Sequence, residues 1–132
     1  MKKYLGLVVI LLCSMFLCSC ATTGGTVKLG SEGTTQVFEA TYDKVWKGAL
    51  FACEQNRLTI DESSVDKGYI SAKAPLRAES WGETVKIWVS KKADNSTEVK
   101  VVSKQVGPAL LFWCNWEKPT MSLIDSYIKT NK

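Results

Sequence analysis

Catalysis or metal binding would need ionisable or nucleophilic side chains at short spacings, and this chain of 132 residues offers few of them. It contains no histidine, which removes the commonest general base, the serine–histidine and cysteine–histidine pairs and most zinc sites. The candidate carboxylates are Asp61 and Glu62, Glu79 and Glu83 around Trp81, and Asp125 on the last predicted helix. Paired carboxylates can hydrolyse glycosides, but each of these acids is expected in a polar loop or on an exposed face. The sequence therefore predicts neither an enzyme nor a metal site.

Residues 1–19 have the pattern of a secretory signal. Lys2 and Lys3 precede an uncharged, largely apolar run over residues 5–17, and no acidic residue occurs in the segment. That run of 13 residues is shorter than the ~20 that a membrane-spanning helix needs and matches the apolar region of a signal peptide. The alternative is a buried helix at the start of a cytosolic domain, but charge placement and length favour export.

The five residues that follow, Leu17-Cys18-Ser19-Cys20-Ala21, resemble the bacterial lipobox. The resemblance implies cleavage between Ser19 and Cys20, diacylglycerol on the Cys20 thiol and an acyl group on the new amino terminus, with no other cofactor. Two or three acyl chains hold a protein stably at a membrane, whereas one is marginal. In a host with two membranes, Ala21 resembles the default for the outer membrane, facing the periplasm. The alternatives are cleavage nearby by an ordinary signal peptidase and an uncleaved signal.

Two cysteines lie in the remainder of the chain, Cys53 and Cys114. In an oxidising compartment an even number of cysteines favours a disulfide, and this one would close a loop of about 60 residues worth ~4 kcal/mol in the chain-entropy model. The alternative is two small buried apolar residues, since Cys53 falls on the apolar side of a predicted helix.

Tryptophan is the remaining unusual feature, with five residues in the chain. Trp46 is expected in a helix core, whereas Trp88 alternates with Val85, Ile87 and Val89 and is expected on the opposite side of its strand. The residues that could form an interaction surface for a protein or a lipid are Trp81, Trp88 and Trp113. The alternative is a larger core in which residues 109–116 fold back over the sheet.

The overall charge is too mild to identify a partner. Without the two lysines of residues 1–19, the chain has 15 basic and 13 acidic side chains, a balance of +2. No basic cluster with interleaved aromatic residues occurs, so nucleic-acid binding is not expected.

Composition divides the mature chain into a tether and one domain. Residues 20–35 are rich in glycine, threonine and serine, which is typical of a flexible linker, although Val27 and Leu29 could form a short strand. Residues 36–132 form the predicted domain. Its expected elements are strands at 37–41, 58–61, 69–73, 84–90 and 98–106, with helices at 43–56 and from 118 to the end. Thr41 or Asp43 is expected to cap the first helix, and Gly48 to weaken it or to admit a closely packed neighbour.

This order, β-α-β-β-β-β-α, predicts an α+β domain with an antiparallel sheet of four to five strands and two helices on one face. The runs 42–50 and 66–72, with their Val45-Trp46 pair and Lys67-Gly68-Tyr69-Ile70 strand start, resemble a widespread type of small, mostly uncharacterised bacterial lipoprotein. The domain of that type is similar to the helix-grip modules of the BamC lipoprotein of the outer-membrane β-barrel assembly machinery. The resemblance implies a binding or scaffold role and assigns no catalytic residue.

The functional prediction is a non-enzymatic, membrane-anchored envelope lipoprotein whose domain contacts another envelope component, most simply a protein. One alternative is a carrier that holds a lipid or other apolar small molecule in a cavity lined by Trp46, Leu50 and Trp88. A further alternative is a cell-wall glycan hydrolase that uses Glu79 and Glu83.

Overall fold

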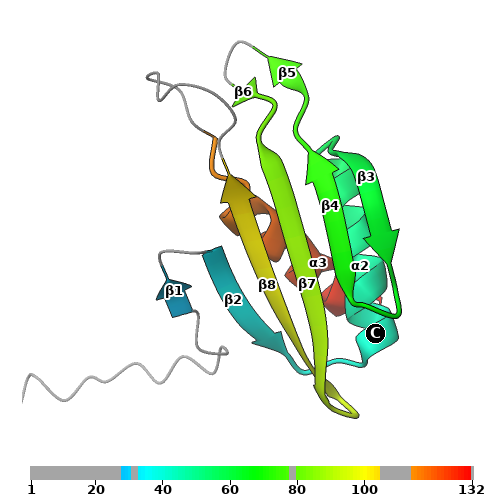
Figure 1. Ribbon diagram of the computed structural model, residues 1–132. Coiled ribbons are helices and arrows are strands. Elements are labelled where there is room, and N and C mark those ends of the chain that lie inside the picture. The colour runs from blue at the N-terminus through cyan, green and yellow to red at the C-terminus, as the bar shows by residue number, and fades with distance from the viewer. Residues whose placement is uncertain (1–27, 31–32, 78–79, 105–113, 132) are drawn as a thin grey trace, which may run out of the picture.

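A computed structural model describes residues 28–30, 33–77, 80–104 and 114–131 of the chain (Figure 1). Its main feature is one antiparallel sheet with two helices, α2 (Tyr42–Gln55) and α3 (Glu117–Thr130). In spatial order its strands are β1 (Lys28–Gly30), β2 (Gly33–Phe38), β8 (Ser96–Lys104), β7 (Thr84–Ala93), β4 (Tyr69–Lys73) and β3 (Thr59–Ser64). A small hairpin of β5 (Leu76–Arg77) and β6 (Ser80–Trp81) extends from one end of the sheet.

The predicted α+β class is confirmed. Five longer strands form the body of the sheet, β1 adds a three-residue edge, and both helices lie on the same face (Figure 1). Each neighbouring pair of strands is antiparallel. The order along the chain is the predicted one, with β1 and the β5–β6 hairpin as short additions.

The hairpin of β7 and β8 forms because its residues alternate between apolar and polar over most of both strands. Val85, Ile87 and Val89 are buried, whereas Trp88 between them is half-buried. The two strands meet at a turn on residues 94–95, where Ala93 is opposite Ser96. This turn is shorter than the predicted 92–97, so each strand extends further toward it.

Helix α2 buries the apolar face that its spacing predicts. Val45, Ala49 and Cys53 have no exposed surface and Trp46 is 9% exposed. The predicted cap is wrong in its chemistry: Thr41 occupies the N-cap position, but its side chain makes no capping hydrogen bond. Only the carbonyl of Thr41 takes part, as the acceptor from the amide of Val45 at 3.1 Å.

The second helix packs against α2 at Gly48, as the predicted close approach requires. A Cβ atom at Gly48 would lie 3.3 Å from Cδ1 of Tyr127 and 3.5 Å from Cγ2 of Ile124, both on α3. The absence of a side chain at Gly48 therefore lets the two helices approach closely, and the packing offsets the lower helix propensity of glycine.

One hydrophobic core fills the space between the helices and the sheet. Its fully buried aliphatic residues come from every long element except β3 and β2: Val45, Ile70, Val85, Ile87, Val99, Val101 and Ile124. Each such side chain stabilises the fold by about 1.5–3 kcal/mol relative to an exposed one. Phe38 of β2 and Met121 of α3 complete this layer at 4% exposure each.

The sheet begins earlier than the predicted domain boundary at residue 36. Strand β1 and the first half of β2 fall within the range 20–35 that composition assigns to a tether, and Thr34 is opposite Val101 of β8. Gly33 explains the difference: a Cβ there would lie 2.5 Å from the carbonyl oxygen of Val101. Glycine at this position serves close approach of two strands and not flexibility.

Candidate interaction surface

The face of the sheet opposite the helices is called the open face here, because no described helix or strand covers it (Figure 1). Strand register places on it side chains that are all partly or wholly exposed: Thr35, Val37, Thr59, Glu62, Ser64, Tyr69, Ser71, Lys73, Thr84, Lys86, Trp88, Glu98, Lys100 and Lys104. Val102 lies on the same face but is only 7% exposed. The alternation that buries one side of each strand in the core thus presents the other side outward.

Trp88 lies at the centre of the open face, as its predicted orientation requires. Its cross-strand neighbours are Tyr69 on β4 and Lys100 on β8. The rings of Tyr69 and Trp88 have centroids 5.6 Å apart and planes inclined at 49°, and Nζ of Lys100 lies 5.9 Å from the Trp88 ring centroid. The cluster is a favourable aromatic pair with a cation–π contact.

Lysines give the open face a positive charge. Lys73 pairs with Asp61 at 3.2 Å, and the acid Glu98 is paired with Lys92 at 3.1 Å. Lys86 and Lys100 form no salt bridge with any described residue. Glu62 of β3 also lies on this face, opposite Ser71, which is opposite Lys86. With Lys104 at the end of β8, the lysines without a salt bridge still outnumber this acid.

The helix layer on the other side is electrically balanced. Each helix has two acids and two lysines: Asp43, Glu54, Lys44 and Lys47 on α2, and Glu117, Asp125, Lys118 and Lys129 on α3. Lys129 and Asp125 also pair with each other at 2.6 Å. The two faces of the molecule thus differ in charge although the whole chain is only mildly basic.

The structure corrects the predicted exposure of Glu83. This carboxylate has no exposed surface, and it accepts a hydrogen bond from Nε1 of Trp116 at 3.3 Å. The adjoining backbone is fixed by the amide of Ala74, which donates to the carbonyl of Glu83 at 2.8 Å. Glu83 therefore sits inside the fold at the start of β7, whereas its expected hydrolytic partner Glu79 lies outside the described residues.

The other carboxylates are spread over the molecule. Asp61 and Glu62 are exposed on β3, and Asp125 is on α3. Among the described residues, histidine, cysteine, aspartate and glutamate side chains nowhere form a group of three that could hold a metal ion.

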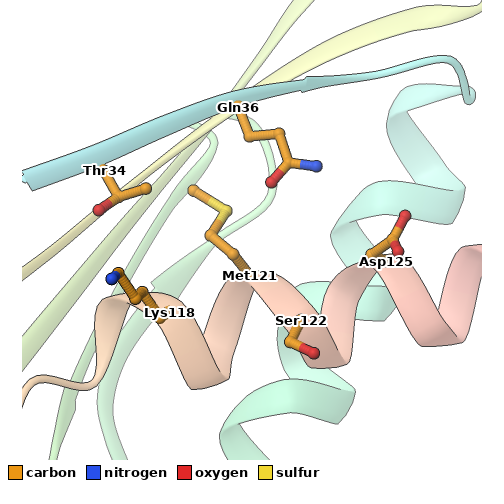
Figure 2. A pocket seen from close by; sticks show the side chains of 6 residues that line it. All are labelled: Thr34, Gln36, Lys118, Met121, Ser122 and Asp125. Carbon is orange, nitrogen blue, oxygen red and sulfur yellow. The ribbon is translucent and has the colours of Figure 1, made fainter. Parts of the chain in front are cut away.

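A groove lies between β2 and α3 (Figure 2). Its volume is about 310 Å³ and its lining is Thr34, Gln36, Lys118, Met121, Ser122 and Asp125. Met121 reaches from α3 toward β2, between Thr34 and Gln36 (Figure 2). The lining of the groove thus combines one apolar residue with five polar or charged ones.

The carrier hypothesis placed three side chains around one cavity, and the fold separates them. Trp46 is in the core cluster and stacks on Tyr42 with centroids 6.3 Å apart. Leu50 packs against the same cluster. Trp88 is on the open face, so the sheet lies between it and the other two.

Cys53 is a core residue. Its thiol has no exposed surface, and burial raises its pKa to about 11. No disulfide bond joins Cys53 to the half-buried Cys114 in this structure. Their pairing in an oxidising compartment stays a prediction.

Several predicted site residues lie outside the described part of the chain. These are Ser19, Cys20 and Trp113, and the side chain of Trp81, whose backbone lies in β6. No described helix is long and apolar enough to cross a membrane.

Sequence reasoning found Trp88 but missed its two neighbours. The sequence predicts Tyr69 only as the start of a strand, and it does not single out Lys100. The turn alone would not have identified Lys100: a two-residue turn at 94–95 puts Val101 opposite Trp88, and the bulge between Lys91 and Ala93 shifts the register by one residue to Lys100.

Comparison with known proteins identifies a family but not a function. No curated protein matches the chain. Among solved structures, the chain is similar to a conserved protein of unknown function, EF2215 from Enterococcus faecalis, at 11% identity. That match covers 81% of this chain and 92% of the other, with a TM-score of 0.31. A family model described as a protein of unknown function (DUF3568) matches residues 4–108, and the chain therefore belongs to this family.

Proposed function

We propose that this protein is a lipid-anchored component of the bacterial cell envelope that acts by binding and not by catalysis, with the open face as its contact surface. The observation that carries the proposal is the half-buried Trp88 with Tyr69 and Lys100 on a sheet face that no described element covers. Aromatic rings with a polar or charged neighbour are favoured at contact surfaces.

The anchor is supported by residues 1–21. They combine a basic start, a short apolar run and the lipobox-like sequence that ends in Cys20 and Ala21. The family match begins at residue 4 and so includes the apolar run and the lipobox-like sequence but not Lys2 and Lys3. In this proposal diacylglycerol is attached to Cys20, and in a host with two membranes the protein lies at the outer membrane, facing the periplasm.

The start of the sheet limits how far the domain can lie from the membrane. Only residues 21–27 separate Cys20 from Lys28, the first residue of β1. Seven fully extended residues span at most about 25 Å. The domain would therefore stay within reach of the lipid headgroups, closer than a tether ending at residue 35 would allow.

A binding role agrees with the distribution of chemistry over the described residues. Glu83 is buried against Trp116, and the adjacent acids Asp61 and Glu62 are exposed on β3, where Asp61 pairs with Lys73. The resemblance to BamC modules leads to the same expectation, a domain that contacts another envelope component. The fold separates the three side chains expected around the carrier's cavity, and Glu83, one of the two acids expected in the glycan hydrolase, is buried.

The anchor can be tested with a fatty-acid probe in living cells. The wild type should be labelled and Cys20→Ser should not. Cys18→Ser is the matched control, because it changes a cysteine two residues away and keeps a small residue there; it should be labelled like the wild type. Equal labelling of Cys20→Ser and wild type would contradict the anchor.

The contact surface can be tested with a photo-crosslinking amino acid at position 88. Position 122, on the exposed side of α3, is the control because it lies on the other face. Crosslinks to an envelope component should form at 88 and not at 122. Equal yields at both positions would contradict a contact confined to the open face.

A further inference from the structure

We infer that the open face docks on anionic lipid headgroups of the membrane that holds the protein, so that the sheet lies against the bilayer and the helices point away. This inference rests on the proposed anchor at Cys20 and names the component that the open face contacts. Its basis is the juxtaposition of lysines without a salt bridge, an aromatic pair and a short connection to the anchor.

The first argument is charge complementarity. Lys86 and Lys100 have no acidic partner among the described residues, and Lys104 is exposed at the end of β8. Each lysine close to an anionic bilayer strengthens binding by about fivefold. The balanced helix layer lacks this attraction, so a negative surface favours one orientation of the domain.

The second argument is the position of the aromatic rings. Tyrosine and tryptophan prefer the headgroup region, where the ring is shielded from water and the polar atom stays hydrated. Tyr69 and Trp88 lie side by side in mid-sheet and both are half-buried. They can rest at headgroup depth without insertion into the hydrocarbon, which suits a flat sheet.

The third argument is the path of the chain from the anchor. Strand β1 is the edge of the sheet, and β2, β8, β7 and β4 follow from it across the molecule (Figure 1). Along this path Thr35 is opposite Lys100, which is opposite Trp88. A short tether gives such a surface an effective concentration in the millimolar range, so a weak lipid contact is sufficient to orient the domain.

The test is residue-resolved acetylation of lysines in the native acylated protein, reconstituted in vesicles. One set of vesicles contains phosphatidylcholine alone. The other contains phosphatidylcholine and the anionic lipid phosphatidylglycerol in a ratio of roughly seven to three, so that its surface attracts lysine. Lys86 and Lys100 should react about fivefold more slowly in the anionic vesicles. Lys44 and Lys118 on the helices should react equally in both. Salt at about 1 M, where the Debye length is near 3 Å, should remove the protection.

A pair of variants separates the open face from net charge. Lys86→Gln with Lys100→Gln should weaken docking by about 30-fold, so that Lys104 is no longer protected. Lys44→Gln with Lys118→Gln makes the same change in net charge on the helices and should leave Lys104 protected. Loss of protection in both double variants would overturn the inference.

The remaining outcomes are also decisive. Equal acetylation of Lys86 and Lys100 in neutral and anionic vesicles overturns the inference. If the lysines are protected in isolated cell envelopes but in neither set of vesicles, the open face contacts a protein partner, and the inferred docking on lipid is wrong. Fatty-acid labelling of the same preparation reports on the anchor separately: a labelled protein with unprotected lysines contradicts docking alone, whereas an unlabelled protein contradicts the anchor and the docking that depends on it.

Discussion

At the scale of single residues, Gly68 closes the loop between β3 and β4 in a conformation that other residues rarely adopt. Its φ is +60°, its amide donates to the carbonyl of Val65 at 3.2 Å, and its carbonyl accepts from the amide of Val89 at 2.7 Å. A Cβ atom there would lie 2.0 Å from the Val89 carbonyl oxygen. The loop therefore needs glycine for both its backbone angle and its contact with β7.

Gly68→Ala is predicted to lower the free energy of unfolding by about 3 kcal/mol, because it adds a steric clash to the cost of a left-handed backbone. Urea denaturation followed by tryptophan fluorescence measures this change. Gly82→Ala is the control, since Gly82 also has a positive φ, +79°, but its nearest contact would be an ordinary 3.5 Å. The control should cost only about 1 kcal/mol, and equal losses would contradict the predicted clash.

The thiol of Cys53 gives the fold a dependence on alkaline pH. Burial raises its pKa from the ordinary 9.0 to about 11, because the interior disfavours the thiolate. Because the pKa of the thiol is higher in the folded than in the unfolded state, burial of the neutral thiol contributes to the free energy of unfolding. That contribution is fully present below pH 9 and is lost as the pH rises through about 11.

The difference in unfolding free energy between wild type and Cys53→Ala should therefore be constant up to pH 8 and then change in favour of the alanine variant. By pH 11 the wild type should have lost about 2 kcal/mol relative to the variant. Subtracting the variant removes other alkaline titrations, including that of Tyr42, whose pKa is also raised, mainly by burial. A difference that stays constant to pH 11 would show that the Cys53 thiolate is not disfavoured by the fold.

At the scale of elements, Glu117 joins the start of α3 to the sheet. One carboxylate oxygen accepts from the hydroxyl of Thr34 on β2 at 2.7 Å, and the other accepts from the amide of Ser103 on β8 at 3.2 Å. The amide of Glu117 donates to the side chain of Asn115 at 2.9 Å. These bonds place the helix over the β2–β8 pair and so help to leave the opposite face open.

Glu117→Ala is predicted to cost about 2 kcal/mol of stability and Thr34→Val about 1 kcal/mol, since each removes a partner from a part-buried hydrogen bond. The double variant should cost less than the sum, because the two changes remove the same bond. Urea denaturation of the four proteins gives the coupling energy. The control is Asp125→Ala, which breaks the surface pair with Lys129 and should cost less than about 0.5 kcal/mol. If the stability losses of the Glu117 and Thr34 variants add fully in the double variant, the predicted hydrogen bond does not contribute.

At the scale of the whole molecule, the sheet decides where the folded domain begins. Thr34 and Thr35 pair with β8 and Gly33 pairs with Gly30 of β1, and Thr34 is 5% exposed. A chain that starts at residue 36 lacks these pairs and the Thr34–Glu117 bond, although composition places the boundary there.

A chain of residues 36–132 is therefore predicted to be less stable than a chain of residues 28–132 by about 2 kcal/mol or more. A chain of residues 33–132, which lacks only the three-residue edge strand β1, should be close to the longer one. The three chains are compared by their urea denaturation midpoints, with one common slope of unfolding free energy against urea concentration. Equal midpoints for starts at 28 and 36 would contradict a structural role for residues 33–35.

Much of the fold could be predicted because its signals are local. The alternation of Val85, Ile87 and Val89 fixed the orientation of Trp88, and the apolar spacing in residues 43–56 identified the buried side of α2. Each of these signals repeats within a few residues, at the period of a strand or a helix.

The candidate surface could be predicted only in part. Trp88 was found from its own strand, but Tyr69 and Lys100 join it from two other strands through pairing register. Glu83 was misjudged because its neighbours in sequence are polar while Trp116, 33 residues away, shields it. Gly33 was misread because composition alone does not distinguish a flexible glycine from one that permits close approach.

By itself the sequence determined the elements, their order and the pattern of residues 1–21, since these depend on residue type and short-range period. Only the tertiary structure decided which side of the sheet stays open, which charges remain unpaired on it and where the domain begins. Those properties arise from contacts between distant residues, such as Thr34 with Glu117 across 83 positions. Side-chain chemistry allows many such pairings, and only the packing of the sheet and helices selects among them.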